Sequence, residues 1–253
     1  MVIFTDKPTL SRILSARSQS TGCTVLFVQD LFKTYLGSKV DWVAQHRKDT
    51  EHRYHSPEAY IIWNQKSLWV SDVAVENPYR STHYFWADSG QFRDEAFLST
   101  YVTRGEKWIT SHTFIPHCQM AFLAVEMFTE KEVGTKLQGR SPPLDPTLVR
   151  LGGGNFGGDS CAVENWRNIF LEEMEWYIEN GAFVGKDQPM YSSACITHKN
   201  SCFLVDGSKV SEIKDIWFAL QPVFHGVTVP VPQYVFAAEA LEVEIKPLHL
   251  LPS

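Results

Sequence analysis

The sequence lacks the patterns of several large protein classes. Its 253 residues contain no apolar run of roughly 18 residues, which a membrane-spanning helix would need. The chain does not begin with a basic segment followed by an apolar one, so we expect no signal peptide and a cytoplasmic location. A formal net charge of −6 argues against nucleic-acid binding, because nucleic-acid-binding surfaces are usually basic.

Cysteine is scarce and irregularly spaced. The chain has five cysteines, an odd number, at Cys23, Cys118, Cys161, Cys195 and Cys202, and none of them forms a CxxC pair. This spacing disfavours a zinc framework. It predicts mostly buried free thiols in a reducing compartment, with a Cys195–Cys202 disulfide as the alternative.

Two common hydrolytic motifs are also absent. The chain contains neither HExxH nor GxSxG, which disfavours a zinc-dependent hydrolase of that type and a serine hydrolase. The glycine-rich run at 152–158 is not placed as in a nucleotide-binding βαβ unit, and no lysine follows it as in a P-loop.

What is present is an alternation of strand-like and helix-like segments. Helical spacing and end signals predict helices at 57–76 and 160–180. Apolar runs predict strands at 2–4, 24–28, 84–88, 193–197 and 202–205, and two further apolar stretches lie near 108–115 and 120–128. Residues 129–146 are polar and rich in glycine and proline, which indicates a surface loop. The alternation favours an α/β fold with a largely parallel sheet.

The helix expected at 57–76 carries a lysine in an unusual position. Lys66 lies three residues from both Trp63 and Trp69, which places it on the aromatic face of the helix. Either its aliphatic stem passes along the tryptophans so that the ammonium group reaches solvent, or the ammonium group is directed at an anion beneath the helix.

Two further features are expected to meet at one edge of the sheet. An apolar run ends abruptly at Asp88, whose carboxylate either forms a turn or supplies an oxygen ligand to a hard cation. The run from Gly152 to Asp159 either makes a tight strand-to-helix turn or lets the backbone approach a ligand or another backbone closely. Ligands of α/β sheets bind outside the carboxyl ends of the strands, which is where Asp88 is placed.

A polar pair, Asp187 and Gln188, follows the second long helix and offers donors and acceptors suited to hydroxyl groups. In this order the segments resemble the HtrL/YibB family, candidate glycosyltransferases associated with lipopolysaccharide-type glycan synthesis. The resemblance extends from about residue 2 to residue 220, and the matching segments are Ile62–Lys66, Asn77–Tyr79, Tyr84–Gly90, Gly153–Gly158 and Asp187–Gln188, with Trp217–Phe218 as a further position.

The resemblance implies a GT-A-like fold, with a mixed, mostly parallel sheet flanked by helices. It also implies a nucleotide-sugar donor, expected to be a UDP-sugar, and a divalent cation, Mn²⁺ or Mg²⁺. Asp88 would take the place of the acidic DxD motif, although the second acid is Gly90 here. Asp88 and His225 would be the metal ligands.

The resemblance also assigns roles around the donor. The donor and sugar would contact Lys66, Asp88, Ser89, Gly153, Gly154 and Asn155. Asp187 and Gln188 resemble the Asp-Gln pair of retaining GT-A enzymes, which implies that they act in catalysis, Asp187 on the sugar and Gln188 near the reaction centre.

Two domain-level expectations follow from the resemblance. Residues 1–221 would form the GT-A-like domain, without the strand-helix unit that usually precedes the equivalent of residue 2, and residues 222–253 would form a proline-rich tail. Two functions therefore compete. An active glycosyltransferase acting on a glycan or other acceptor predicts turnover, whereas a degenerate or truncated member predicts binding of glycan or nucleotide without turnover.

Overall fold

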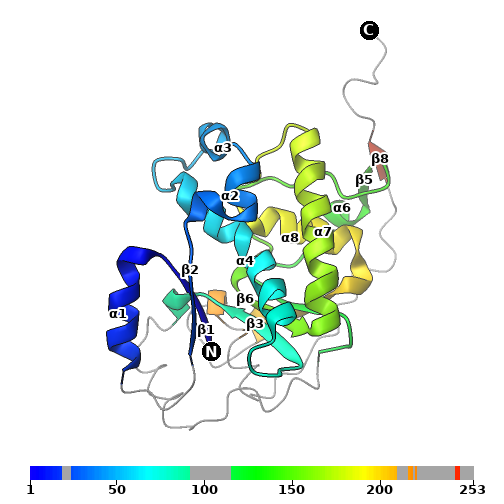
Figure 1. The fold of residues 1–253 in the computed structure, drawn as a ribbon. Coiled ribbons are helices and arrows are strands. Elements are labelled where there is room, and N and C mark those ends of the chain that lie inside the picture. Colours follow the sequence, from blue (N-terminus) through cyan, green and yellow to red (C-terminus); the bar gives the residue numbers. More distant parts are fainter. Residues whose placement is uncertain (19–23, 92–114, 210–215, 219, 221–242, 246–253) are drawn as a thin grey trace.

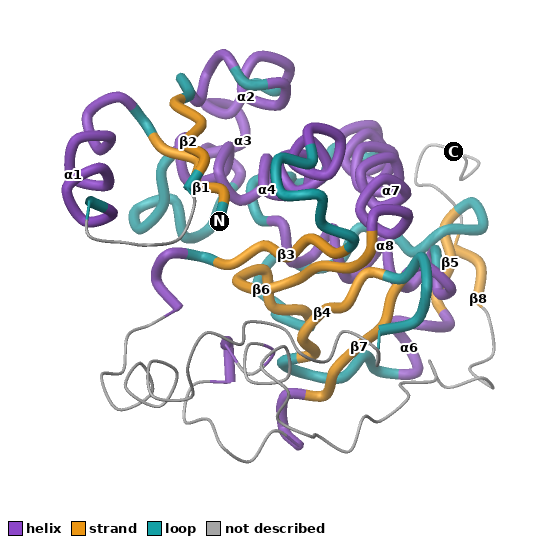
Figure 2. The backbone as a smooth tube through the Cα atoms, turned by 60° about the horizontal axis from the view of Figure 1, so that its bottom comes forward, coloured by secondary structure: helices purple, strands orange, loops and turns teal. Residues whose placement is uncertain are grey.

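A four-stranded sheet lies at the centre of the molecule. The computed structural model describes residues 1–18, 24–91, 115–209, 216–218, 220 and 243–245. The central strands, in their order across the sheet, are β3 (His83–Ala87), β6 (Leu151–Asp159), β4 (Met120–Ala124) and β7 (Cys202–Asp206). Three helices cover one face of this sheet (Figures 1 and 2): α4 (Pro57–Glu76), α7 (Ser160–Glu179) and α8 (Asp187–Thr197).

The other elements surround this centre. Strands β1 (Val2–Thr5) and β2 (Val25–Val28) form a separate parallel pair beside the sheet (Figure 2), and β5 (Thr135–Leu137) pairs with β8 (Val243–Ile245). The remaining helices are α1 (Lys7–Arg17), α2 (Tyr35–Lys39), α3 (Trp42–Lys48), α6 (Glu130–Gly134) and the 3₁₀ turns η1 (Leu31–Lys33), η2 (Ser89–Gln91), η3 (Lys199–Ser201), η4 (Gly207–Lys209) and η5 (Ile216–Phe218).

The α/β class is confirmed, but the expectation of a mostly parallel sheet is wrong. Among the described strands of the central sheet, only β4 and β7 pair in parallel, because β6 runs antiparallel to both β3 and β4. The segment at 129–146, expected to be a loop, contains α6 and β5. No helix in the described part of the chain is both long and apolar enough to cross a membrane.

The glycine-rich run is the second strand of the sheet, not a turn. Strand β6 is hydrogen-bonded to a neighbour on each side, so its backbone groups are satisfied there. A Cβ atom at Gly157 would overlap the carbonyl oxygen of Tyr84 and the backbone of Phe85. A Cβ atom at Gly153 would overlap the carboxylate of Asp187. The glycines therefore allow close approach of backbone and of a buried carboxylate, which is one of the alternatives expected from the sequence.

The two long helices match the sequence prediction closely. Helix α4 begins after Ser56, whose hydroxyl accepts a hydrogen bond from the amide of Ala59, and it ends at Asn77 with a left-handed φ of 40°. Helix α7 begins after Asp159, whose carboxylate accepts from the amide of Ala162. Gly181 follows its end with a φ of 68°, a conformation that favours glycine.

Helix α8 was expected to be a strand at 193–197. All residues from Pro189 to Ile196 are buried, so the apolar run has no exposed face that would reveal a helical period. The helix packs into an aromatic core in which Tyr191 contacts the rings of Phe122, Phe156 and Trp166 at centroid distances of 5.2, 5.5 and 5.5 Å. This core fixes α8 against the sheet.

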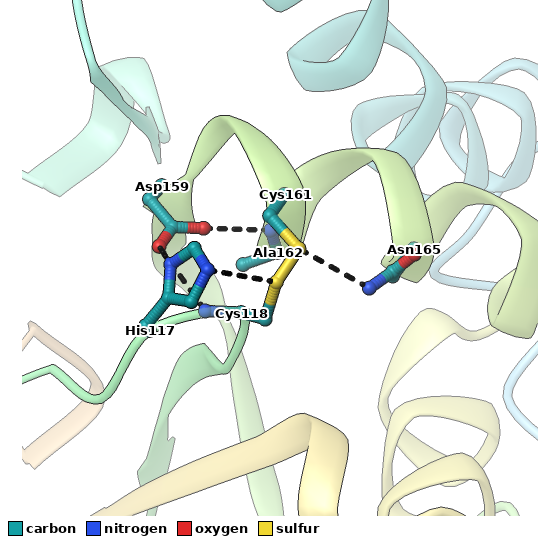
Figure 3. Close-up of a disulfide and its surroundings, with 6 residues drawn as sticks. All are labelled: His117, Cys118, Asp159, Cys161, Ala162 and Asn165. Atoms are coloured by element: carbon teal, nitrogen blue, oxygen red, sulfur yellow. Dashed lines mark hydrogen bonds and ion pairs between the residues drawn. A yellow bond between two sulfur atoms is a disulfide. The ribbon is translucent and has the colours of Figure 1, made fainter.

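Two disulfides replace the expected free thiols. One joins Cys118, just before β4, to Cys161 in the first turn of α7, next to His117 and Asp159 (Figure 3). The other joins Cys195 in α8 to Cys202 at the start of β7, the pairing that the sequence left as an alternative. The Cα–Cα distances of 4.9 and 5.6 Å lie in the usual disulfide range. The cysteines therefore no longer support a reducing compartment.

Candidate functional site

The candidate site lies where β3 ends beside the first half of β6. Ala87 pairs with Asn155, and the amide of Asp88 donates a hydrogen bond to the carbonyl oxygen of Gly154 at 2.9 Å. Asp88 and the glycine-rich run therefore meet at one edge of the sheet, as the sequence predicted. They meet because the two strands are antiparallel neighbours.

A pocket of about 380 Å³ opens at this edge. Six of the residues predicted from the sequence line it, namely Lys66, Asp88, Gly153, Gly154, Asp187 and Gln188. Ser89 and Asn155 lie next to these residues in the chain but are not among those that line the pocket. The predicted metal ligand His225 lies outside the described residues.

Lys66 is the more buried of the two lysines that line the pocket. Its side chain is only 3% exposed, so the reading in which it reaches solvent is wrong. The ammonium group donates a hydrogen bond to the carbonyl oxygen of Gly153 at 2.9 Å. It also lies 3.2 Å from Asp187 Oδ2 and 3.5 Å from Asp88 Oδ1. A single buried ammonium group therefore bridges two carboxylates that come from different elements.

Asp187 is the more buried of these carboxylates. It occupies the first residue of α8, and 5% of its side chain is exposed. Burial raises the pKa of Asp187 above its usual value, and the charge of Asp88 adds to this, while Lys66 opposes both. A carboxyl group whose pKa is raised by burial in a pocket is typical of functional sites.

Asp88 is the more exposed of the two carboxylates. Its side chain is 37% exposed, and Oδ1 accepts a hydrogen bond from Trp86 Nε1 at 2.6 Å. Magnesium-type cations commonly use one or two carboxylates together with substrate phosphates and water. Asp88 could therefore supply a carboxylate oxygen to such a cation.

A family model described as "Bacterial protein of unknown function (HtrL_YibB)" matches residues 1–226. The chain belongs to the HtrL/YibB family. No curated protein and no solved structure matches the chain. The family description names no activity, so function has to be argued from the pocket.

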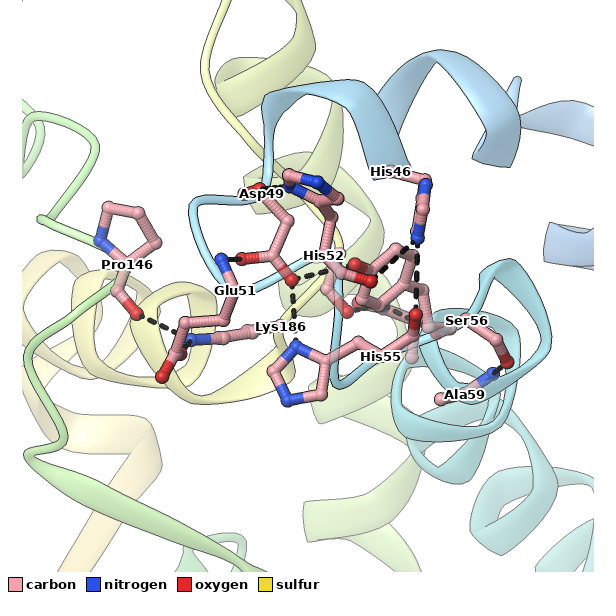
Figure 4. Close-up of polar contacts among 12 residues, drawn as sticks. His46, Asp49, Glu51, His52, His55, Ser56, Ala59, Pro146 and Lys186 are labelled. Carbon is pink, nitrogen blue, oxygen red and sulfur yellow. Dashed lines mark hydrogen bonds and ion pairs between the residues drawn. The ribbon is translucent and has the colours of Figure 1, made fainter.

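Several pocket residues of this HtrL/YibB protein were not predicted as site residues. Glu51 and His55 come from the segment between α3 and α4, and Lys186 precedes α8; Figure 4 shows all three. Lys186 forms an ion pair with Glu51 and donates a hydrogen bond to the carbonyl oxygen of Pro146 at 3.3 Å. No local motif marks these residues, because tertiary packing brings them to the pocket.

Two tryptophans also line the pocket, together with Val149. Trp63 projects from α4 and Trp217 from η5, and the Trp217 residue is 38% exposed. The sequence indicated both positions, Trp63 as part of an aromatic face and Trp217 as a matching family position. Apolar ring faces combined with carboxylates and an amide suit a ligand that has both C–H and hydroxyl surfaces.

Proposed function

We propose that this protein is a glycosyltransferase that moves a sugar from a nucleotide-sugar donor, a UDP-sugar, to a hydroxyl group of a glycan or other acceptor. The observation that carries the proposal is the buried ammonium group of Lys66 between Asp88 and Asp187 in an open pocket. The pocket thus offers carboxylates to a divalent cation and to sugar hydroxyls, and Lys66 offsets part of their negative charge.

The diphosphate is proposed to lie near Lys66 and Asp88. Lys66 limits the negative charge that a diphosphate would meet there, because its buried ammonium group pairs with both Asp88 and Asp187. A divalent cation, Mn²⁺ or Mg²⁺, would be held by Asp88 together with the phosphates. When bound, it would offset the negative charge of the leaving diphosphate.

The sugar is proposed to lie between the tryptophans and the start of α8. Trp63 and Trp217 offer apolar faces, and Gln188 offers both a donor and an acceptor to sugar hydroxyls. Asp187 accepts a hydrogen bond from a hydroxyl and holds the ring in position. In the transfer, the bond between the anomeric carbon and the phosphate oxygen breaks, and the acceptor oxygen bonds to that carbon.

A second reading is binding without turnover. It is favoured by Gly90, which stands where the second acid of a DxD motif would be, and by Lys66, which already pairs with both carboxylates. The two readings differ in whether UDP is released from a UDP-sugar, so one assay separates them.

We expect wild-type protein with Mn²⁺ to release UDP from at least one of UDP-glucose, UDP-galactose and UDP-N-acetylglucosamine. Asp187→Asn removes the carboxylate charge but keeps its size, and we expect it to lower the rate by about 100-fold, as loss of one group that stabilises the transition state does. The measurement is a coupled UDP-detection assay with and without simple glycoside acceptors.

The matched control is Asp72→Asn, which removes an exposed carboxylate of α4 that pairs with Arg167 away from the pocket. It should leave the rate unchanged. UDP binding without release from any of the three donors would support the binding-only reading. Equal rates in wild type and Asp187→Asn would contradict the role of Asp187.

A further inference from the structure

A histidine that lines the same pocket is hydrogen-bonded to an aspartate buried behind it. Asp49 follows the end of α3, and His55 precedes the start of α4. The two residues are joined by a hydrogen bond of 2.7 Å between His55 Nδ1 and Asp49 Oδ2 (Figure 4). His55 lines the pocket, whereas Asp49 is buried behind it, with 2% of its side chain exposed.

Asp49 is held in its ionised form. Burial by itself would raise its pKa, but hydrogen bonds from Tyr60, from His55 and from the amide of Glu51, together with the charge of Lys186, hold the pKa below its usual value. The bond from Tyr60 Oη is 2.6 Å long and the bond from the Glu51 amide is 2.8 Å long. An ionised carboxylate only accepts hydrogen bonds, so Nδ1 of His55 carries the proton.

This arrangement determines what the second ring nitrogen can do. In a neutral imidazole with a proton on Nδ1, Nε2 holds a lone pair and accepts a proton. Figure 4 shows this nitrogen directed away from Asp49. The ring is held at its edge by Trp63, at a centroid distance of 5.0 Å, and 21% of the side chain is exposed.

The charged and titratable groups next to His55 include Asp49 and Glu51 in its own segment, His46 on α3, Tyr60 on α4 and Lys186 before α8. Lys186 is already neutralised by Glu51. Asp49 is therefore the charge bonded directly to the ring, and it holds the ring in one orientation and one tautomer. An ionised aspartate behind a histidine serves the same purpose in the hydrolase triad.

We propose that His55 Nε2 takes the proton from the acceptor hydroxyl group during glycosyl transfer. The inference rests on the proposed function and adds the acceptor side of the same pocket. The acceptor O–H bond breaks and its proton moves to Nε2. The oxygen forms a bond to the anomeric carbon of the donor, whose bond to the phosphate oxygen breaks, and the nucleoside diphosphate leaves with that electron pair.

The proposal also places the acceptor. Its reacting hydroxyl lies beside His55, at the part of the pocket formed by Trp63, Glu51 and Lys186, and the donor lies over Lys66, Asp88 and Asp187. Asp49 is a positioning residue, since it acts only through the imidazole.

The test compares UDP release from UDP-galactose and UDP-glucose, with Mn²⁺ and water as acceptor, in wild type and His55→Gln. Water needs the same proton acceptor, so no glycan acceptor has to be known. General-base catalysis contributes roughly 10²–10⁴-fold, so we expect a loss of that size in kcat. The rise in melting temperature caused by UDP should stay as in wild type, which also shows that the variant is folded.

Two further variants sharpen the result. His117→Gln removes another imidazole whose Nδ1 is hydrogen-bonded to an aspartate, Asp159, but which does not line the pocket, and it should keep the wild-type rate. His55→Ala should regain part of the lost activity with free imidazole in the buffer, which a merely structural role would not allow.

The outcomes separate the two proposals. UDP release by wild type with an equal rate in His55→Gln overturns the role of His55 and leaves the glycosyltransferase intact. A lost rate in His55→Gln without imidazole rescue of His55→Ala also overturns it. If wild type releases no UDP, whether or not it binds UDP, the proposed transfer fails, and the role of His55 fails with it.

Discussion

Replacing Lys66 with methionine is expected to lower the free energy of unfolding by about 3–5 kcal/mol at pH 8. Methionine fills similar space but carries no charge. Asp187, with 5% of its side chain exposed, would then lose its cation while remaining next to Asp88. Removal of one partner from a buried ion pair leaves an uncompensated charge, and that costs more than the pair itself contributes. Urea unfolding of both proteins measures the difference.

The loss is expected to be smaller at pH 5 than at pH 8. The pKa of Asp187 is already raised in the folded protein, and it rises further without Lys66. A carboxyl group whose pKa is raised in the folded protein destabilises the fold least below its pKa in the unfolded chain, about 3.9, where it is protonated in both states. The free energy of unfolding then falls as pH rises through the pKa of the folded state. Lower pH thus protonates Asp187 in the variant. The unpaired negative charge is then absent, and the loss in free energy of unfolding is smaller.

Lys33→Met is the matched control. Lys33 Nζ lies 3.3 Å from Asp30 Oδ2, but its side chain is 84% exposed. Loss of such a surface pair typically costs about 0–1 kcal/mol. Adding Asp187→Asn to Lys66→Met should recover part of the stability. A Lys66→Met protein as stable as the Lys33→Met protein would show that the buried ion pairs are not formed.

Removing the disulfide between Cys118 and Cys161 is expected to cost about 4 kcal/mol. The bond links residues that are 43 positions apart, and the entropy lost by the unfolded chain grows with the length of the closed loop. The Cys195–Cys202 bond spans only 7 positions, so the same argument gives about 2 kcal/mol. Urea unfolding of the two paired Cys→Ser variants under non-reducing conditions tests this order.

A thiol titration provides the independent check. With four of the five cysteines in disulfides, the unfolded and unreduced protein should show a single reactive thiol, and the reduced protein should show five. Five thiols without reduction would contradict both bonds and restore the free-thiol expectation. In that case the paired serine variants would lose little stability.

Local signals predicted the long helices well. Helix α4 carries a capping serine, a proline in its first turn and a left-handed asparagine at its end, and its bounds agree with those expected. Lys66 was also recognised correctly as unusual, because three- and four-residue spacing places it among tryptophans. The spacing of residues along the helix could not show whether the ammonium group reaches solvent or a carboxylate. Its partners Gly153 and Asp187 are distant from Lys66 in the sequence.

The misassigned segments share a physical cause. The run Gly152–Asp159 was not predicted as a strand, because glycine is intrinsically poor in strands, although close backbone approach was one of the two alternatives. Close neighbours on β3 and at Asp187 exclude larger side chains there. The end of α8 was read as a strand because burial on all sides hides the helical period. His55 and Glu51 were missed because only tertiary packing brings them beside Lys186.

The central claim, that the pocket over Lys66 and Asp88 binds the diphosphate of a nucleotide sugar, is tested most directly by UDP binding. Melting temperatures of wild type and Asp88→Asn would be measured with increasing UDP, with and without Mn²⁺. At a UDP concentration of about 100 Kd, bound ligand adds about 2.7 kcal/mol of stability, or a rise of roughly 5–10 °C. The account predicts this rise for wild type with Mn²⁺ and its loss in Asp88→Asn. No rise in wild type, or an equal rise in both proteins, would contradict it.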